Sequence, residues 1–309
     1  MIGQGTVEEL QLTDAGAPEP GLRRGRAKSY WSESWDRLRA NRVGMLAGYL
    51  ILLLALVAIL APLFSALVTH IDPTKQDLDS QFLPPGPQHW LGADETGRDT
   101  LTRLIWGARV SLGVGFLTVT IQIIVGGGVG LVAGFFSGWV DNLLMRIVDM
   151  VLAIPAIFLF ILMAILFTPT AVTLSLIIAS VGWGGVARLV RGEVLSVRGR
   201  DFMLATRSLG ASNLRLILRH LLPNVLPVMI VAASLGVGAI ILAEAALDFL
   251  GFGIHPPTPS WGNMLSNAQT YFAHSTWLVV FPGIMIFLTV LAANLFGNAV
   301  RDAFDPRLR

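Results

Sequence analysis

Six uninterrupted apolar runs, each about twenty residues or longer, constrain the fold of this 309-residue chain more than any other feature. A helix needs roughly 20 residues to cross a hydrocarbon core about 30 Å thick. Charged residues make up only 14% of the sequence, against 54% hydrophobic residues, and the runs lack the alternation of barrel strands. We therefore predict an all-α integral membrane protein with six transmembrane helices, at residues 43–68, 110–136, 147–167, 171–190, 225–250 and 276–300.

The distribution of basic residues predicts the orientation of the chain. Of the 22 lysines and arginines, 18 lie near the two ends of the chain, at Arg146, or between Arg188 and Arg219. Cytoplasmic segments carry such an excess. Both termini are therefore predicted to be cytoplasmic.

The segment before the first apolar run is predicted to have two parts. Residues 1–28 are rich in Gly, Pro and acidic residues, which is typical of a disordered tail. In residues 29–42, Trp31, Trp35 and Leu38 share one helix face, which indicates a short interfacial helix; ordinary aromatic anchoring explains the same pattern. The first run is too long for a cleaved signal peptide, so we expect an anchor that begins a transmembrane domain over residues 43–309.

Several chemistries lack the residues they need. The chain has no cysteine, which excludes disulfides and thiolate metal sites. Its only lysines, Lys28 and Lys75, follow Ala27 and Thr74, so no phosphate-binding P-loop is present. The five histidines have no metal-ligand spacing, and neither a G-x-S-x-G motif nor a basic-aromatic surface for nucleic acid occurs. These observations predict a non-enzymatic protein without a bound metal, cofactor or nucleic acid.

Few ionisable residues fall within the apolar runs, where charges are costly and usually functional. Asp149 follows Arg146 by three residues, so a local ion pair is expected. Glu244 and Asp248 share a face near the outer end of the fifth run. They either line a translocation path or outer gate, or are interfacial groups that reach water. No acid, histidine or lysine relay crosses the bilayer centre, which disfavours a proton-driven carrier.

The second run carries a glycine at every fourth position, at Gly126, Gly130, Gly134 and Gly138. This spacing places the glycines on one helix face and allows another helix to approach closely. The pattern fits a helix contact within the subunit or a dimer interface.

The polar segment at about 191–224 contains too many arginines to cross the bilayer, so it is predicted to be a cytoplasmic loop. A short helix is expected from Asp201, Gly210 is suited to the left-handed position that ends it, and Ser212 can cap the next helix. Leu214, Ile217, Leu218 and Leu221 predict an apolar stripe on that second helix, with Arg215 and Arg219 on another face, and Pro223 is expected to break it before the fifth span. Such a bend is suited to docking a cytoplasmic partner, or to packing on the membrane surface.

This segment resembles the E-A-A-x3-G-x9-I-x-L-P signature of permease subunits of ATP-binding-cassette (ABC) importers. Ala205, Gly210 and the pair Leu222-Pro223 match it, whereas Leu204, Thr206 and His220 stand in place of the glutamate, the second alanine and the isoleucine. Two further stretches, LGADETGRDTLTRLIWGARVSL at 91–112 and EAALDFLGFGIHPPTPSWGNML at 244–265, resemble the C-type subunit of dipeptide, oligopeptide and nickel importers. The resemblance covers about residue 30 to the end.

The resemblance implies a type I ABC importer permease in a bacterial plasma membrane, where it forms half of the translocation pathway. It implies a homologous B-type permease, two cytoplasmic ATPases or one fused ATPase chain, and an extracytoplasmic binding protein as partners, within the membrane lipid. ATP and Mg²⁺ would be bound by the ATPases. The implied ATPase-coupling residues are Asp201, Ala205, Arg207, Gly210, Ala211, Ser212, Arg215, Arg219, Leu222 and Pro223.

At the outer side, the chargeless loop after Glu244 and Asp248 carries three prolines and Trp261, which predicts a rigid lip around an outer gate, or ordinary scaffolding. Peptides are the expected solute, with nickel, glutathione and other small solutes as alternatives within the family. A secondary carrier and a non-transporting scaffold are the rival functions. Inverted repeats, which would favour a carrier, are not evident in the sequence.

Overall fold

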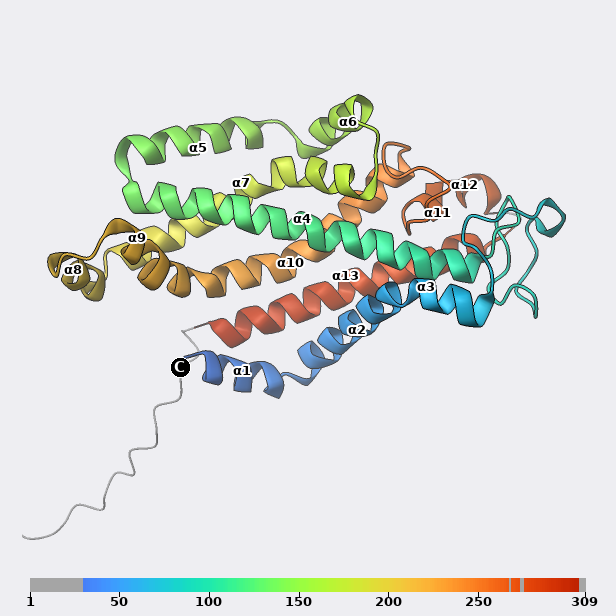
Figure 1. Ribbon diagram of the computed structural model, residues 1–309, viewed down its shortest axis with the longest axis horizontal. Helices are drawn as coiled ribbons and strands as arrows, with labels where there is room; N and C mark the ends of the chain where they lie inside the picture. Colours follow the sequence, from blue (N-terminus) through green and yellow to red (C-terminus); the bar gives the residue numbers. More distant parts are fainter. Residues whose placement is uncertain (1–29, 267, 273–274, 306–309) are drawn as a thin grey trace, which may run out of the picture.

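The computed structural model describes residues 30–266, 268–272 and 275–305, and they form a helical bundle. Five helices there are long and apolar enough to span a membrane, counting α10 together with the helical turns that precede it (Figure 1). The long helices are α2 (Arg42–Ile59), α4 (Thr100–Phe136), α7 (Ala171–Arg198), α10 (Leu222–Phe249) and α13 (Trp277–Phe304). They correspond to five of the six predicted spans.

The third predicted span, 147–167, is not one continuous helix. It divides into α5 (Gly138–Ala153) and α6 (Ala156–Leu166), which are bent by 83°. Pro155 lies in the break. Proline has no N–H to donate and forces the preceding residue out of the helical region, and Ile154 accordingly has φ −92° and ψ 129°. The bundle has six spans only if this bent pair counts as one.

The first and second spans also differ from their predicted limits. Continuous α-helix in the first stops at Ile59, and α3 (Ala61–Phe64) and the π-helix η1 (Ser65–Thr69) follow. The second begins ten residues before the apolar run, because the Asp99 carboxylate caps α4 by accepting the Thr102 N–H at 2.8 Å. Polar capping extends α4 beyond its apolar part.

One end of the bundle gathers both ends of the described chain. Helix α1 (Tyr30–Ala40) packs on the end of α13, where the Tyr30 hydroxyl donates to the Phe304 carbonyl at 2.8 Å. Helices α8 (Asp201–Ser208) and α9 (Asn213–Arg215) project from the same end (Figure 1). The interfacial position of α1 stays a prediction, and the predicted tail at 1–28 lies outside the described residues.

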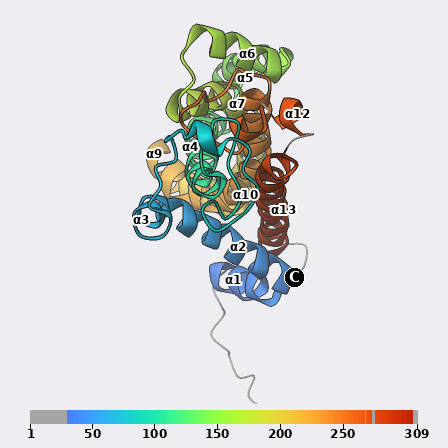
Figure 2. The same cartoon turned by 90° about the vertical axis from the view of Figure 1, so that its right-hand side faces the viewer.

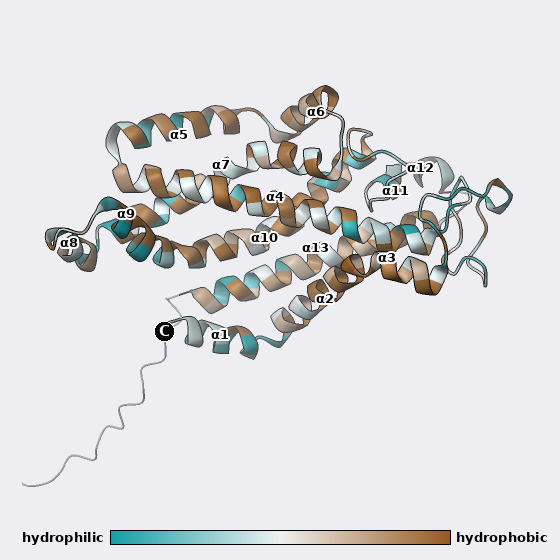
Figure 3. Cartoon of the chain, viewed as in Figure 1, coloured by the Kyte–Doolittle hydropathy of each residue, from teal (hydrophilic) through white to brown (hydrophobic). Residues whose placement is uncertain are grey.

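The opposite end carries the long connections (Figure 2). They include the 3-10 helix η2 (Leu78–Ser80) and the short helices α11 (Asn263–Ser266) and α12 (Ala268–Tyr271). Hydrophilic residues gather at the two ends of the molecule, and hydrophobic residues predominate between them (Figure 3). Large apolar side chains such as Leu46, Leu52 and Phe158 are exposed on this middle zone, as lipid-facing residues are.

Candidate functional site

The polar segment at 201–223, called the elbow here, forms a bend at the end of the bundle. Helix α8 stops before Gly210, whose φ of +80° lies in the left-handed region, as the sequence suggests. The Ser212 hydroxyl then accepts the Arg215 N–H at 3.4 Å and caps α9. The chain reverses through these two residues, and the π-helix η3 (Leu216–Leu221) leads it into α10.

Three buried apolar side chains fix the elbow to the bundle. Met203, Leu216 and Leu221 belong to one hydrophobic cluster with residues of α4 and α7, among them Phe135 and Val194. The α8–α9 bend is therefore anchored at its base and free at its tip.

The predicted apolar stripe on the second helix is wrong in detail, since Leu214 and Leu218 are exposed. The buried pair is Leu216 and Leu221, five residues apart, because a π-helix bonds each N–H to the carbonyl five residues earlier and so aligns positions i and i+5. Pro223 does not break the chain either. It is the second residue of α10 and follows the π-helix η3 directly, and the helical path continues from Asn213 to Phe249.

All ten predicted coupling residues are at least partly exposed, with Ala211 and Leu222 half-buried. Leu209 at the tip is 88% exposed. Within the described ranges, none of Arg207, Arg215 and Arg219 has a carboxylate partner. Exposed leucines beside unpaired guanidinium groups form a surface suited to another protein with acidic groups.

At the other end of the bundle, Glu244 and Asp248 are buried, so neither reaches water in this subunit. Ser111 of α4 donates a hydrogen bond to Glu244 at 3.0 Å. Asp248 accepts the Ile254 N–H at 2.5 Å and the Ser260 hydroxyl. Asp248 therefore holds the loop that follows α10, and Glu244 joins α10 to α4.

Trp261 is fully buried and its indole N–H donates to the Leu104 carbonyl at 2.9 Å. Trp261 is therefore not exposed on the predicted lip around an outer gate. The Trp261 ring instead fixes the loop to α4, while Pro256 and Pro257 are exposed at its tip and Pro259 is buried. We name the Glu244, Asp248, Ser260 and Trp261 contacts the outer clamp.

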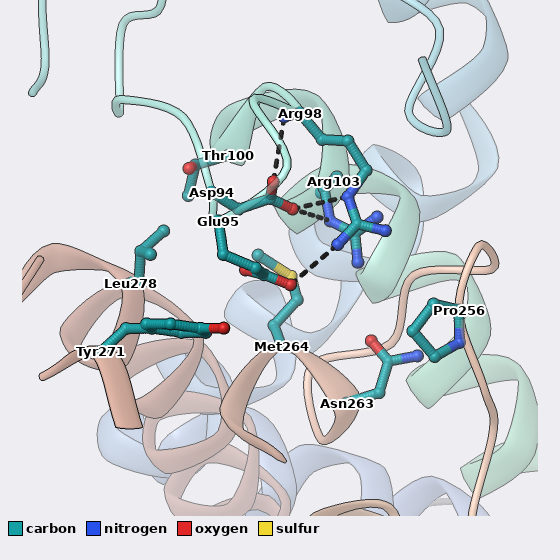
Figure 4. A pocket seen from close by; sticks show the side chains of 10 residues that line it. All are labelled: Asp94, Glu95, Arg98, Thr100, Arg103, Pro256, Asn263, Met264, Tyr271 and Leu278. Carbon is teal, nitrogen blue, oxygen red and sulfur yellow. Dashed lines mark hydrogen bonds and ion pairs between the residues drawn. The ribbon is translucent and has the colours of Figure 1, made fainter. Parts of the chain in front are cut away.

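Beside the outer clamp lies a buried ion network that the sequence reasoning missed (Figure 4). Asp94 accepts the Nε–H of Arg98 at 2.7 Å and lies 3.4 Å from the Nε of Arg103, and Arg98 also pairs with Glu95 at 3.0 Å. The two acids Asp94 and Glu95 and the two arginines Arg98 and Arg103 lie within one short stretch, and this mixture of opposite charges is the signal that could have indicated the network. The network joins the loop before α4 to its first turn.

Asp149 does not pair with Arg146. Its carboxylate contacts Arg188 of α7 at 2.6 Å, and Asp141 contacts Arg191 at 2.5 and 2.7 Å. The partners lie on a neighbouring helix, because α5 runs beside α7. Two ion pairs thus join α5 to α7.

Three of the four predicted packing glycines form a close contact between α4 and α7 within the subunit. Added Cβ atoms at Gly130 and Gly134 would lie 2.6 Å from the Ala187 carbonyl oxygen and 2.7 Å from the Val194 Cβ, and Gly126 is equally crowded. Gly138 is not part of this contact. It has φ +60° in the turn after α4, with no neighbour within 4 Å of an added Cβ.

Comparisons with known proteins agree with this architecture. Residues 126–309 match the family described as binding-protein-dependent transport system inner membrane component, and residues 29–85 match the N-terminal TM domain of oligopeptide transport permease C. The chain is 40% identical to the dipeptide transport system permease protein DppC of Alkalihalophilus pseudofirmus, over 92% of each chain.

It is also 34% identical to the oligopeptide transport system permease protein OppC of Bacillus subtilis, over 91% of each chain. It is 35% identical to the glutathione transport system permease protein GsiD of Pectobacterium atrosepticum, over 94% of this chain and 95% of that protein.

A solved structure of the MetNI methionine ABC transporter, in inward facing conformations, shares the fold. The TM-score is 0.53 at 19% identity, over 66% of this chain and 97% of that chain. The bundle, the family match and the full-length relatives agree: the chain belongs to the family of binding-protein-dependent transport system inner membrane components, as a non-catalytic, multi-pass permease subunit of a bacterial ABC importer.

Proposed function

We propose that the elbow docks on cytoplasmic ATPase subunits and transmits their movement into the bundle, and that the imported solute is a short peptide. The observation that carries the first part is the left-handed Gly210 at an exposed tip whose base is buried. A bend with a fixed base and an exposed tip moves as one body with the helices to which it is anchored.

Helix continuity supports this transmission. The helical path Asn213–Phe249 has 37 residues, or about 55 Å at 1.5 Å per residue, and it crosses the bundle without a sharp break. Its first turns belong to the elbow, and Asp248 in its last turn belongs to the outer clamp. A displacement at the elbow therefore reaches the loop at the other end, as alternating access requires.

The family implies where ATP is bound. The sequence has no P-loop lysine and so cannot supply a Walker A phosphate site. In our proposal ATP and Mg²⁺ are bound by the ATPase partners that the family implies. In our proposal the elbow lies in the cytoplasm, a homologous B-type permease forms the other half of the pathway, and a binding protein delivers the solute to the opposite side. The excess of basic residues at the elbow end favours this orientation.

The solute is inferred from the relatives. Their names specify dipeptide, oligopeptide and glutathione transport, and glutathione is itself a tripeptide. A peptide backbone is the feature these solutes share. Uptake of a radiolabelled dipeptide by cells that express the complete transporter tests this part, and uptake of nickel but of no peptide would contradict it.

Docking of the elbow is tested by co-purification in detergent. The double variant Arg207→Glu/Arg215→Glu is expected to lose the ATPase while it retains the second permease, because only the elbow charges change. Arg301→Glu, an exposed arginine at the same end but outside the elbow, is the matched control and should retain both partners. Full retention of the ATPase by the double variant would contradict docking at the elbow.

A further inference from the structure

An apolar cavity of about 560 Å³ lies between α1, α2, α4, α10 and α13. This is within the roughly 300–1,000 Å³ usual for ligand sites. Aliphatic and aromatic side chains form its wall, among them Met45, Tyr49, Phe116 and Phe296. The Ser234 hydroxyl in the wall already donates to the Ile230 carbonyl at 2.9 Å. The wall therefore offers hydrocarbon contacts and few free polar groups.

One cation borders this cavity. Arg39 of α1 contributes to the lining, and its guanidinium lies 5.0 Å from the centre of the Trp35 ring. In the described part of the chain Arg39 has no carboxylate partner. An unpaired cation next to an apolar cavity is complementary to an amphiphile with an anionic head.

The far end of the cavity lies about the depth of one leaflet from the start of α2. On α2, the helix starts at Arg42 and the lining residue farthest along it is Leu52. Ten residues of helix rise about 15 Å, which is half of a hydrocarbon core about 30 Å thick. A chain that enters beside Arg39 would reach the bilayer centre at the far end of the cavity.

We propose that this cavity binds an anionic phospholipid of the cytoplasmic leaflet, with the phosphate at Arg39 and one acyl chain along α2. The leaflet follows from the orientation proposed above, but the binding itself does not depend on the ATPase or on the solute. Annular lipid around the bundle needs no such cavity, so the bound lipid should be retained when bulk lipid is removed.

Native mass spectrometry tests the proposal. The full chain, purified with its partner subunits, is exchanged into nanodiscs of equal parts 1-palmitoyl-2-oleoyl phosphatidylglycerol and phosphatidylcholine, and the retained lipid is identified after release. We expect one phosphatidylglycerol per subunit. Arg39→Gln should reduce its preference over phosphatidylcholine about fivefold, the usual effect of one basic residue near an anionic headgroup.

Three further variants separate the site from general effects. Ala233→Phe fills the cavity wall and should remove both lipids, whereas Leu242→Phe adds the same ring at an exposed position of α10 outside the cavity and should leave retention unchanged. Arg301→Gln removes an equivalent exposed charge and should keep the preference.

Equal retention of both lipids by the wild-type chain would overturn the proposal, as would an unchanged preference in Arg39→Gln. Absence of retained lipid, with a helix of the second permease crosslinked to position 49 or 52, would assign the cavity to that partner instead. Loss of ATPase docking would contradict the elbow proposal but would not alter lipid retention, so the two proposals fail separately.

Discussion

Replacement of Gly210 by an L-residue is expected to uncouple the permease from its ATPase. Gly210 has φ +80°, and an added Cβ would meet no atom within 4 Å. The cost is therefore conformational and not steric packing: about 1–2 kcal/mol for an L-residue held in the left-handed region. A β-branched residue is disfavoured further there.

This cost acts on the bend itself. A change of 1–2 kcal/mol shifts the equilibrium between the bent elbow and other shapes roughly 5–30-fold. If only the bent shape docks, the apparent affinity for the ATPase falls by the same factor once the bent shape is the minor one, and by less while it still dominates. Gly210→Ala should therefore weaken docking by up to about 5–30-fold, and Gly210→Val should weaken it more.

Dissociation constants for the ATPase, measured on permease complexes reconstituted in nanodiscs, check this magnitude, and peptide uptake at equal membrane abundance checks its consequence. Gly210→Asn should recover much of the affinity, because asparagine tolerates the left-handed region. Gly199→Val is the matched control: Gly199 has φ −80°, and its added Cβ also meets open space. Wild-type affinity in Gly210→Val, or equal losses in Gly210→Val and Gly199→Val, would refute the reasoning.

Three other substitutions test the contacts that hold the bundle together. Gly130→Ala should lower stability by about 1–3 kcal/mol, seen as a lower Tm in detergent. Gly128 lies on the same helix but faces open space, so Gly128→Ala should leave the Tm unchanged. Equal Tm values of the two variants would refute the close α4–α7 contact. Asp248→Ala leaves the buried Ile254 N–H of the outer loop without its acceptor, which costs about 1–3 kcal/mol. An external protease should therefore cut the outer loop faster. Unchanged cleavage would contradict a role of the outer clamp in holding this loop. Arg98→Ala removes the 2.7 Å partner of the buried Asp94 carboxylate, which then keeps only Arg103 at 3.4 Å. The change should cost up to about 3–5 kcal/mol of stability, seen as a lower Tm, unlike the exposed Lys75→Ala. A similar small effect of both substitutions would show that the ion network is not needed.

Helices were largely predictable because their signal is local. Twenty apolar residues in sequence define a span whatever lies beside it, so five long helices appear close to their predicted places. The bend at Pro155 was readable from the proline, but the long apolar run around it favoured a single span. The first turns of α4 lie outside the apolar run, so hydropathy does not indicate them, and the predicted start of that helix is ten residues too late.

The elbow was predictable because glycine and serine have strong positional preferences. Gly210 and Ser212 adopt the conformations that their residue types favour. The face buried by the second helix was not predictable, since the π-helical hydrogen bonds of η3 replace the 3.6-residue period with contacts at i and i+5.

Partners distant in sequence were beyond local reasoning. Asp149 pairs with Arg188, 39 residues away, and not with the arginine one turn before it. Glu244 receives its hydrogen bond from Ser111, 133 residues away. Burial of Glu244 depends on how α4 and the outer loop cover α10, and a single sequence does not specify that packing.

The central claim is that the elbow is a cytoplasmic docking surface, and site-specific labelling tests it most directly. Because the chain contains no cysteine, Leu209→Cys and Thr258→Cys each introduce one thiol, at an exposed position at opposite ends of the bundle. With a membrane-impermeant maleimide, Leu209→Cys should be labelled only in inside-out vesicles and should be protected when the ATPase is bound, and Thr258→Cys only in right-side-out vesicles. Labelling of Leu209→Cys in intact right-side-out vesicles, or in inside-out vesicles with no protection by a saturating amount of ATPase, would contradict the account.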